Sequence, residues 1–427
     1  MALKTPENQS QAQNNENSQK LVIQEKVSMF LERKFRRSRS FKTIETYKQA
    51  INKFTVFLAS KYSLDFIQLL KAIESKQKDP LDIIDDYYTF LTKCPNKTGK
   101  TGLSRSTTAN YLSVAKEFLN GEGCKIYQED IRNRFRLPPI SRTYEKGLSR
   151  QTINRVLRLS NPKLSCTILM ACSGGFRIGE IVQLQISDID FTTNPTTITI
   201  RAETTKTRQT RVTHISSEAT TALKDYLAKS GLREYNDEDK YIILKHHDER
   251  IRSLKHNITG KEFDKKPVVH LRKLLEKWET ELQILGSEER YARDVTVAIQ
   301  SLETKLSKVV REIPDLNTKN DNGRNYFHFH ALRAWFKTQV TDAHQSDFAE
   351  ALMGHSSLKL LYYRQNDKAR AETYRQIEHA VTIADTEKFD ENFTEMQEDY
   401  QDLRRQFDGL SKFVRNLEKN VVLKTKS

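Results

Sequence analysis

The chain from residue 177 onward carries a set of side chains whose types suit attack on a phosphodiester bond. The set comprises two arginines, a lysine, two histidines and a tyrosine: Arg177, Lys206, His330, Arg333, His355 and Tyr362, with Tyr363 as the alternative tyrosine. Attack spreads negative charge over the non-bridging oxygens, and fixed cations and hydrogen-bond donors stabilise that charge. A tyrosine can keep the bond energy in a covalent ester, while a proton donor assists the leaving 5′ oxygen. Such a set suits attack on a phosphodiester bond by a side chain of the protein.

The first two members lie in local sequences that favour contact with a phosphate. In the run GGFRIGE, Arg177 follows a glycine turn at the expected start of a helix. A guanidinium there can bind phosphate through two parallel hydrogen bonds. Lys206 falls at the tip of an expected β-hairpin, where a lysine can reach a scissile group.

The remaining members follow further along the chain. HALR places His330 and Arg333 on adjacent turns of one helix face, and GHSS places His355 near a helix end. Each group alone has an ordinary structural explanation, such as a salt-bridge partner, a surface turn or a core side chain. Their combination in this order favours the chemical interpretation.

The N-terminal part is expected to be a helical DNA-binding domain over residues 22–135, preceded by a polar, disordered tail over residues 1–21. A basic run follows the first helix, and a second helix begins at a hydroxyl-rich turn. Hydroxyl and basic groups at such positions bind phosphates. The candidate DNA contacts here are Arg36, Arg37, Arg39, Lys42, Ser104 and Arg105.

Residues 136–147 contain two prolines and read as a linker to a second domain over residues 148–386. Alternating residues 197–200 and 211–215 predict the β-hairpin that carries Lys206, with Arg208 and Arg211 as further DNA contacts. Residues 232–262 show little periodicity. Two apolar stripes predict a helical hairpin insertion at about 266–315, and the last catalytic helices are expected at about 329–384.

The C-terminal segment, residues 387–427, has apolar residues at alternating steps of four and three. This spacing is typical of a coiled-coil seam and predicts a partner helix. A long helix packed on its own domain is the alternative. The expected fold class is mainly α, with a small sheet in the second domain.

Composition is consistent with a nucleic-acid partner. The 427 residues include 71 Lys and Arg against 56 Asp and Glu, a formal net charge of +15. Basic groups placed on phosphates release counterions from DNA. No apolar run is long enough for a membrane span or a signal peptide, which predicts an intracellular protein. The four cysteines lack metal-ligand spacing and are expected to be buried or incidental.

The ordered set resembles the catalytic pattern of the tyrosine recombinase (phage integrase) family: Arg, Lys, His-x-x-Arg, His and Tyr. SGGFRIGEIVQL, TKTR, HALRAWF and LMGHSS are similar to the family's boxes, and the helical N-terminal half is similar to its core-binding domain. The run after the tyrosines looks closest to integrases of archaeal mobile elements. Together the resemblance spans roughly residues 22–384.

The resemblance implies a role for each residue. Arg177 and Arg333 would clamp the scissile phosphate, and Lys206 would protonate the leaving 5′ hydroxyl. His330 would handle the proton of the nucleophile, and His355 would donate to a non-bridging oxygen. Tyr362 would form a 3′-phosphotyrosyl link, with Tyr363 as the runner-up, and Glu180 would hold the arginine box in place. No cofactor is implied.

Two features depart from the family pattern. Both tyrosines lie closer to His355 than the family's usual spacing, which is why the choice between them stays open. Tyr374 lies too far along the chain to be a good candidate. The separation between Lys206 and His330 is unusually long, and the predicted insertion accounts for most of it.

The leading hypothesis is an integrase that inserts or excises a mobile element, acting on double-stranded DNA as a homo-oligomer, either a dimer or a tetrameric synapse. It is expected in the cytoplasm with the nucleoid. A resolvase or transposase would use the same chemistry, and a type IB topoisomerase fits the boxes less well. A non-catalytic DNA-binding protein that assembles through its coiled coil is the alternative from another class.

Overall fold

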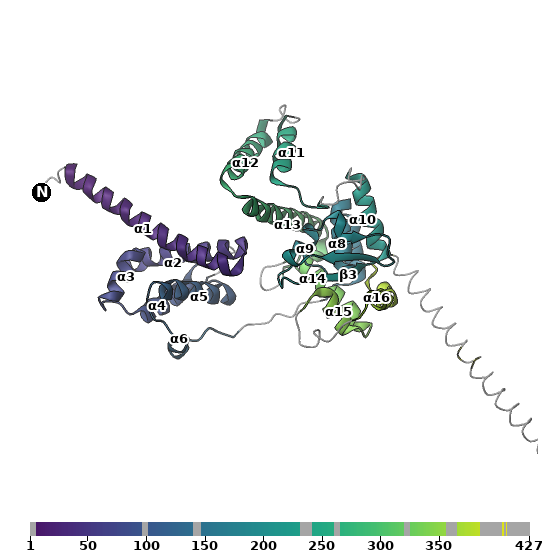
Figure 1. Cartoon of the computed structure of the whole chain (residues 1–427), viewed down its shortest axis with the longest axis horizontal. Helices are drawn as coiled ribbons and strands as arrows, with labels where there is room; N and C mark the ends of the chain where they lie inside the picture. Colours follow the sequence, from purple (N-terminus) through teal and green to yellow (C-terminus); the bar gives the residue numbers. More distant parts are fainter. Residues whose placement is uncertain are drawn as a thin grey trace, which may run out of the picture. The chain divides into compact units, whose positions relative to one another are not determined.

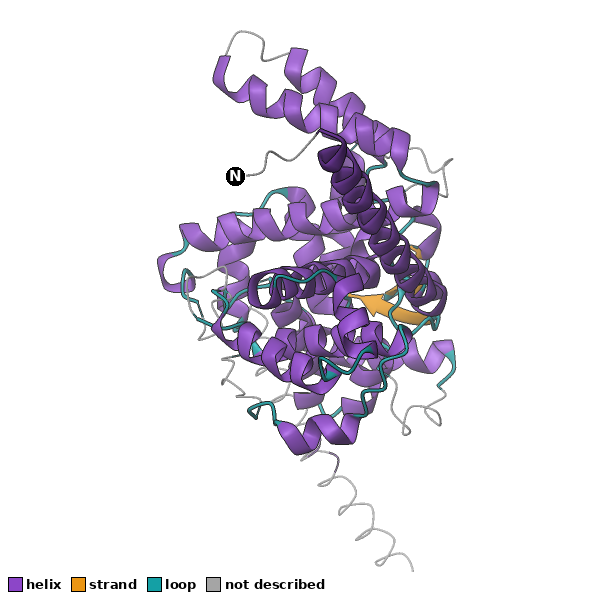
Figure 2. Cartoon of the chain, turned by 90° about the vertical axis from the view of Figure 1, so that its left-hand side faces the viewer, coloured by secondary structure: helices purple, strands orange, loops and turns teal. Residues whose placement is uncertain are grey.

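The computed structural model describes residues 6–95, 101–139, 147–230, 241–259, 265–319, 325–355 and 365–384, with Arg404 and Phe407. The chain divides into two compact units, Met1–Thr143 and Tyr144–Ser427. Helices dominate both, and a small sheet belongs to the second (Figure 2). Among these residues no helix is long and apolar enough to cross a membrane. The predicted fold class, mainly α with a small sheet, is confirmed.

The first unit consists of helices packed around an aromatic core. The helices are α1 (Pro6–Ser38), α2 (Phe41–Tyr62), α3 (Phe66–Glu74), α4 (Pro80–Lys93), α5 (Arg105–Gly121) and α6 (Gln128–Arg134). Phe54, Phe66, Tyr87 and Phe118 are fully buried between them. The hydroxyls of Ser40 and Ser104 accept from backbone N–H groups at the starts of α2 and α5, as hydroxyl caps do.

Helix α1 corrects the predicted disordered tail, because it begins at Pro6 and includes most of residues 1–21. Its C-terminal half is anchored in the core, where Phe30 and Leu31 are buried and Ile23 and Val27 pack beside them. Extending an existing helix costs far less than starting one, so a packed end can support a polar extension. Low hydrophobicity in the tail indicated only that it lacks a core of its own.

The second unit is built around a helix with no polar face. It begins with α7 (Arg150–Arg158), α8 (Pro162–Gly174), α9 (Ile178–Val182) and α10 (Ser217–Lys229). In α8 the run from Cys166 to Gly174 is buried, and the helix packs against α10 and against α14 (Phe329–Asp342). A helix that is apolar on all sides belongs in a core.

A three-stranded antiparallel sheet lies beside α8. Its strands are β1 (Ile189–Asp190), β2 (Thr196–Ile200) and β3 (Arg211–Ile215), in the order β1-β2-β3, with short 3-10 turns at Ile186–Asp188 and Ala202–Thr204. The strands β2 and β3 pair as predicted, with Ile198 opposite Thr213. Lys206 and Arg208 therefore lie on the connection between two fixed strands.

The predicted insertion is helical, but its two helices do not pack against each other as the predicted hairpin requires. Helices α12 (Lys265–Ile284) and α13 (Ser287–Glu312) are present, and α11 (His247–Thr259) lies in the segment with little periodicity. The apolar stripe of α12 packs on α11, whereas α13 buries Leu302, Leu306 and Val310 in the catalytic core. Figure 1 shows α11 and α12 side by side, with α13 running to the rest of the unit. The expectation of a simple two-helix hairpin was therefore wrong.

The unit ends with α14, α15 (Ser346–Met353) and α16 (Asp367–Val381), preceded by a 3-10 turn at Pro314–Leu316. Helix α14 packs against both α15 and α16. The predicted coiled coil over residues 387–427 lies outside the described residues, apart from Arg404 and Phe407. Its pairing stays a prediction.

Candidate active site

Arg177 is positioned by a sharp turn at the end of α8. Gly175 adopts a left-handed conformation, with φ at 62°, and a Cβ there would lie 2.5 Å from the Phe336 ring. Only glycine fits such a turn without strain. The chain then enters α9, where Glu180 accepts from the Arg177 backbone N–H at 2.7 Å and from its Nη1 at 2.9 Å. The Arg177 side chain remains about one-third exposed, with 32% of its surface accessible.

Glu180 is a buried carboxylate that serves more than one arginine. Arg211 on β3 donates to both of its oxygens, at 3.0 and 2.6 Å, and to the Leu352 carbonyl at 2.8 Å. Burial alone would raise the pKa of the Glu180 carboxyl, but the hydrogen bonds and charge of Arg211 and the hydrogen bonds from Arg177 bring the pKa below its usual value. The expectation that Glu180 is structural agrees with this geometry. Arg211, expected to contact DNA, is instead buried and committed to Glu180.

Arg333 on α14 connects the arginine turn to the end of α15. Its guanidinium donates to the Gly175 carbonyl and, at 2.7 Å, to the Met353 carbonyl. It also lies 4.0 Å from Glu180. Burial, together with the charge of Arg177, lowers the pKa of Arg333 to about 10, so the side chain stays cationic at neutral pH. Arg177 and Arg333 thus lie near the same carboxylate, which brings the two cations together.

His355 follows α15 directly and turns towards Arg333. The helix ends at Gly354 in a left-handed conformation, with φ at 66°. The His355 Nε2 atom then lies 3.2 Å from Arg333 Nη2, and its Nδ1 atom contacts the Glu350 carboxylate. Arg333 and His355, two members of the predicted set, are therefore in direct contact.

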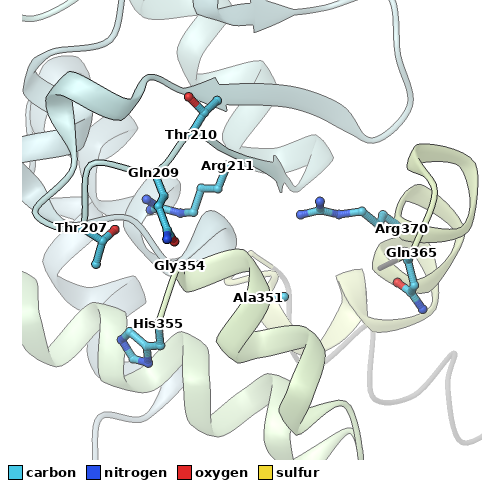
Figure 3. Close-up of a pocket in the computed structure, with 9 residues that line it drawn as sticks. All are labelled: Thr207, Gln209, Thr210, Arg211, Ala351, Gly354, His355, Gln365 and Arg370. Carbon is cyan, nitrogen blue, oxygen red and sulfur yellow. The ribbon is translucent and has the colours of Figure 1, made fainter. Parts of the chain in front are cut away.

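Beside these residues lies a pocket of about 210 Å³ (Figure 3). Residues from the hairpin, from the end of α15 and from the start of α16 line it: Thr207, Gln209, Thr210, Arg211, Ala351, Gly354, His355, Gln365 and Arg370. Thr207 and Gln209 flank the hairpin tip, so the loop that carries exposed Lys206 forms the rim of the pocket. Arg208 is exposed on the same loop.

His330 lies at the start of α14, one turn before Arg333. It is exposed, and its ring centroid is 6.4 Å from that of His328. The structure brings together Arg177, Arg333 and His355 through direct contacts. Lys206 lies on the hairpin loop and His330 at the start of α14, and both are exposed.

The tyrosines divide into two kinds. Tyr362 and Tyr363 lie outside the described residues, between His355 and Gln365, which both line the pocket. Tyr374 is fully buried, and its hydroxyl donates to the Ser173 carbonyl at 2.8 Å. Burial raises the pKa of Tyr374 well above its usual value. A buried, hydrogen-bonded phenol cannot reach a DNA phosphate, so Tyr374 is a core residue.

Sequence reasoning missed three side chains of this region: Glu350, Gln365 and Arg370. Arg370 on α16 lines the pocket and donates to the Val212 carbonyl on β3. Glu350 contacts His355 from the preceding helical turn. Glu350 lies five residues before His355, in the helix that His355 follows, whereas no sequence pattern links Arg370 to β3.

The candidate DNA contacts of the first unit lie at helix ends. Arg36, Arg37 and Arg39 are exposed at and after the end of α1, and Lys42 is exposed in the first turn of α2, 2.7 Å from Glu45. Ser104 caps α5, and Arg105 Nε donates to the Pro138 carbonyl at 2.8 Å. None of these groups is in the core of the unit.

Comparison with known proteins gives one family. Residues 146–370 match the sequence model described as Phage integrase family. Among solved structures, XerA recombinase is 19% identical, with 83% of this chain and 98% of that chain covered and a TM-score of 0.32. A lambda integrase dimer bound to a COC′ core site is 13% identical, with 81% and 98% covered and a TM-score of 0.45.

The Tn1549 transposon integrase in complex with a circular intermediate DNA is 15% identical, with 76% of this chain and 99% of that chain covered and a TM-score of 0.41. No curated protein matches the chain.

Proposed function

The chain belongs to the phage integrase family and is a tyrosine-type site-specific DNA recombinase, and we propose that it acts through the residues around the pocket. The observation that carries the assignment of residues is the direct contact network of Arg177, Glu180, Arg333 and His355. It places two cations and a hydrogen-bond donor around one site, which is what a pentavalent phosphate needs. The assignment also includes Lys206 on the hairpin loop and His330 at the start of α14.

In the proposed reaction, the phenol oxygen of Tyr362 attacks the scissile phosphorus, and the bond to the 5′ oxygen breaks. His330 takes the phenol proton, and Lys206 gives a proton to the leaving 5′ oxygen. Arg177 and Arg333 neutralise the charge on the non-bridging oxygens, and His355 donates to one of them. The products are a 3′-phosphotyrosyl link and a free 5′ hydroxyl, and attack by a 5′ hydroxyl of a partner strand reverses the steps.

Tyr363 is the alternative nucleophile. Support for either tyrosine comes from the chain on both sides of them, because His355 and Gln365 line the same pocket. The residues on either side of the segment that contains both tyrosines therefore lie at the pocket, and this supports the proposal that one of the two tyrosines is the nucleophile.

We assign binding of double-stranded DNA to both units. The exposed basic groups Arg36, Arg37, Arg39 and Lys42, with Ser104 and Arg105, would contact phosphates from the first unit, and Arg208 from the hairpin. One chain holds one nucleophile site, whereas exchange between two duplexes requires several cuts. We therefore propose a homo-oligomer on DNA, a dimer or a tetrameric synapse, that integrates or excises an archaeal mobile element in the nucleoid.

The test is capture of the covalent intermediate. The probe is a pool of 5′-labelled duplexes of randomised sequence, each with a nick that lets the 5′-hydroxyl fragment diffuse away after cleavage. We expect a protein–DNA adduct that survives denaturation, with the label mapped to Tyr362 or Tyr363. Replacing that tyrosine with Phe should abolish the adduct.

Tyr374→Phe is the matched control, because it removes one buried hydroxyl at a cost of about 1 kcal/mol and leaves both candidate nucleophiles intact. That variant should still form the adduct. No adduct with the unmodified chain, or an adduct that persists in the double Tyr362→Phe, Tyr363→Phe variant, would overturn the proposal and favour a DNA-binding protein without catalysis.

A further inference from the structure

Glu350 lies in the last turns of α15 and contacts two side chains at once. One carboxylate oxygen contacts His355 Nδ1, and the other contacts the ammonium of Lys337 on α14. An ordinary explanation is that Glu350 ties α15 to α14 through Lys337. Glu350 also contacts His355, a residue of the proposed site, so a change at Glu350 can affect that site directly.

The hydrogen bonds of His355 fix where its proton lies. A guanidinium only donates, so the His355 Nε2 atom, 3.2 Å from Arg333 Nη2, must accept. A carboxylate only accepts, so His355 Nδ1 carries the proton and donates it to Glu350. The two partners together select one tautomer and aim Nε2 at the arginine clamp.

We propose that Glu350 is a positioning residue of the recombinase, which orients His355 and stabilises its protonated form when a DNA phosphate occupies the site. This inference rests on the proposed function. Nε2 cannot donate to a non-bridging oxygen while it accepts from Arg333. When the phosphate enters, Arg333 turns its hydrogen bond to the anion, and Nε2 takes up a proton from solvent, which reaches it because 35% of the side chain is exposed.

The charges that face His355 explain why Glu350 matters. Arg333 lies against it, Arg211 and Arg370 line the same pocket, and Lys337 contacts Glu350, so cations surround this part of the site. Glu350 is the carboxylate in contact with the ring, and an incoming phosphate would bring a second anion beside it. Burial raises the pKa of Glu350, but hydrogen bonds from Lys337 and His355 bring it below its usual value, so the carboxylate stays charged at neutral pH.

The resting tautomer can be tested without any DNA. Nitrogen-15 NMR of histidine-labelled full-length protein at pH 8, with His355→Asn to assign the signal, reports which ring nitrogen carries hydrogen. We expect Nδ1–H in the unmodified chain and in Glu350→Gln, whose amide oxygen still accepts, and loss of this preference in Glu350→Ala. An Nε2–H tautomer in the unmodified chain, or the same tautomer in Glu350→Ala, would overturn the inference.

The charge of Glu350 is tested by the pH profile of single-turnover adduct formation on a duplex recovered from the nicked pool. Glu350→Gln should slow the reaction about tenfold at pH 8 and less than about threefold at pH 6, because the neutral amide no longer favours the imidazolium. In a His355→Asn background, the same change should have no further effect.

Lys337→Gln is the matched control, since it breaks the tie between α14 and α15 and leaves the contact of Glu350 with His355. If Glu350 acted only by joining the helices, Lys337→Gln would lower the rate as much as Glu350→Gln, at every pH. Equal losses would reject the positioning role. Absence of any adduct with the unmodified chain would reject the proposed function instead, while the NMR result would still decide the tautomer.

Discussion

Three arginines gather around Glu180, and a single buried carboxylate makes this arrangement stable before DNA binds. Arg177 and Arg211 bond to it directly, and Arg333 lies 4.0 Å away. Without the carboxylate, the three guanidinium charges would repel one another strongly in a partly buried site. With it, three guanidinium groups and one carboxylate leave a net positive charge that suits the proposed binding of a phosphate. Positions fixed in advance in this way avoid reorganisation during the reaction.

His214 on β3 offers a pH-dependent measure of the stability of the same unit. Its side chain is buried against Tyr374, with ring centroids 5.4 Å apart, and its Nε2 atom has no hydrogen-bond partner among the described residues. Burial, helped by the charge of Arg370, lowers the pKa of His214 to about 4. In the unfolded chain a histidine has a pKa near 6.5. Protonation therefore favours the unfolded state as the pH falls below about 6.5.

We expect the free energy of unfolding to decrease by about 2 kcal/mol from this residue between pH 7.5 and pH 5. His214→Phe keeps an aromatic ring and cannot be protonated, so it should remove this part of the pH dependence while the acid-sensitive carboxylates remain. Urea unfolding of both proteins at the two pH values measures the difference. Equal pH dependence in the two proteins would contradict the burial of a neutral His214.

At the scale of elements, the residue pattern of a short segment was sufficient to predict structures that depend only on neighbouring residues. Alternation with a short turn predicted β2 and β3, and the glycines before Arg177 predicted the turn between α8 and α9. The pattern was insufficient for the insertion, because an apolar stripe shows that a face is buried and not what buries it. The stripes of Leu275 and Leu306 looked like partners, but one packs on α11 and the other in the catalytic core.

The same limit applies to the site. Arg333 and His355 could be expected near each other because both match one catalytic pattern. The contact of Arg211 with Glu180 joins β3 to α9, and the pocket joins the hairpin to α16. Such contacts depend on how helices and strands pack, and spacing along the chain carries no record of it.

The insertion is held to the catalytic core by a buried ionic cluster, which leads to a prediction at this scale. Asp294 on α13 accepts from Arg250 and lies 3.4 Å from His247, both on α11 and both buried. Arg250 also stacks over Trp278 of α12, 4.7 Å from its ring centroid. The cluster therefore joins all three helices at one place.

Asp294→Ala would leave the Arg250 cation buried without its carboxylate, at a cost of about 3–5 kcal/mol if the burial were kept. The cheaper response is for α11 and α12 to separate from α13. We expect faster hydrogen exchange over His247–Ile284 and unchanged exchange in α8, because Leu302 and Leu306 still anchor α13 in the core. Leu306→Ala is the contrasting variant and should accelerate exchange in α8. Equal acceleration of both regions by Asp294→Ala would show that the insertion is not a separable part.

At the scale of the whole molecule, the two units offer DNA different kinds of contact. The second unit holds the proposed phosphate clamp, and the first has exposed basic groups at helix ends. The chain carries a net charge of +15, which favours contact with phosphates in general and selects no sequence. Choice of a site therefore requires base contacts or DNA deformation in addition to this charge.

Assembly is the remaining property of the whole molecule, and residues 387–427 are the segment whose pattern predicts it. Leu403, Leu410, Val414 and Leu417 belong to the proposed seam, and a seam of this kind is stable only when a second helix covers it. We expect removal of residues 388–427 to lower the mass of the complex on DNA, measured by light scattering, because protomers lose this contact. Cleavage of a single nicked half-site should stay within about twofold, because the residues of the proposed clamp, Arg177, Arg333 and His355, lie outside this segment.

Leu403→Asp with Leu410→Asp in the full-length chain is the matched test, since it disrupts the seam and keeps the length of the segment. It should reproduce the change in mass. If the truncated chain loses half-site cleavage while the double variant keeps it, the segment completes the catalytic unit in place of joining protomers, and the alternative of a helix packed on its own domain holds.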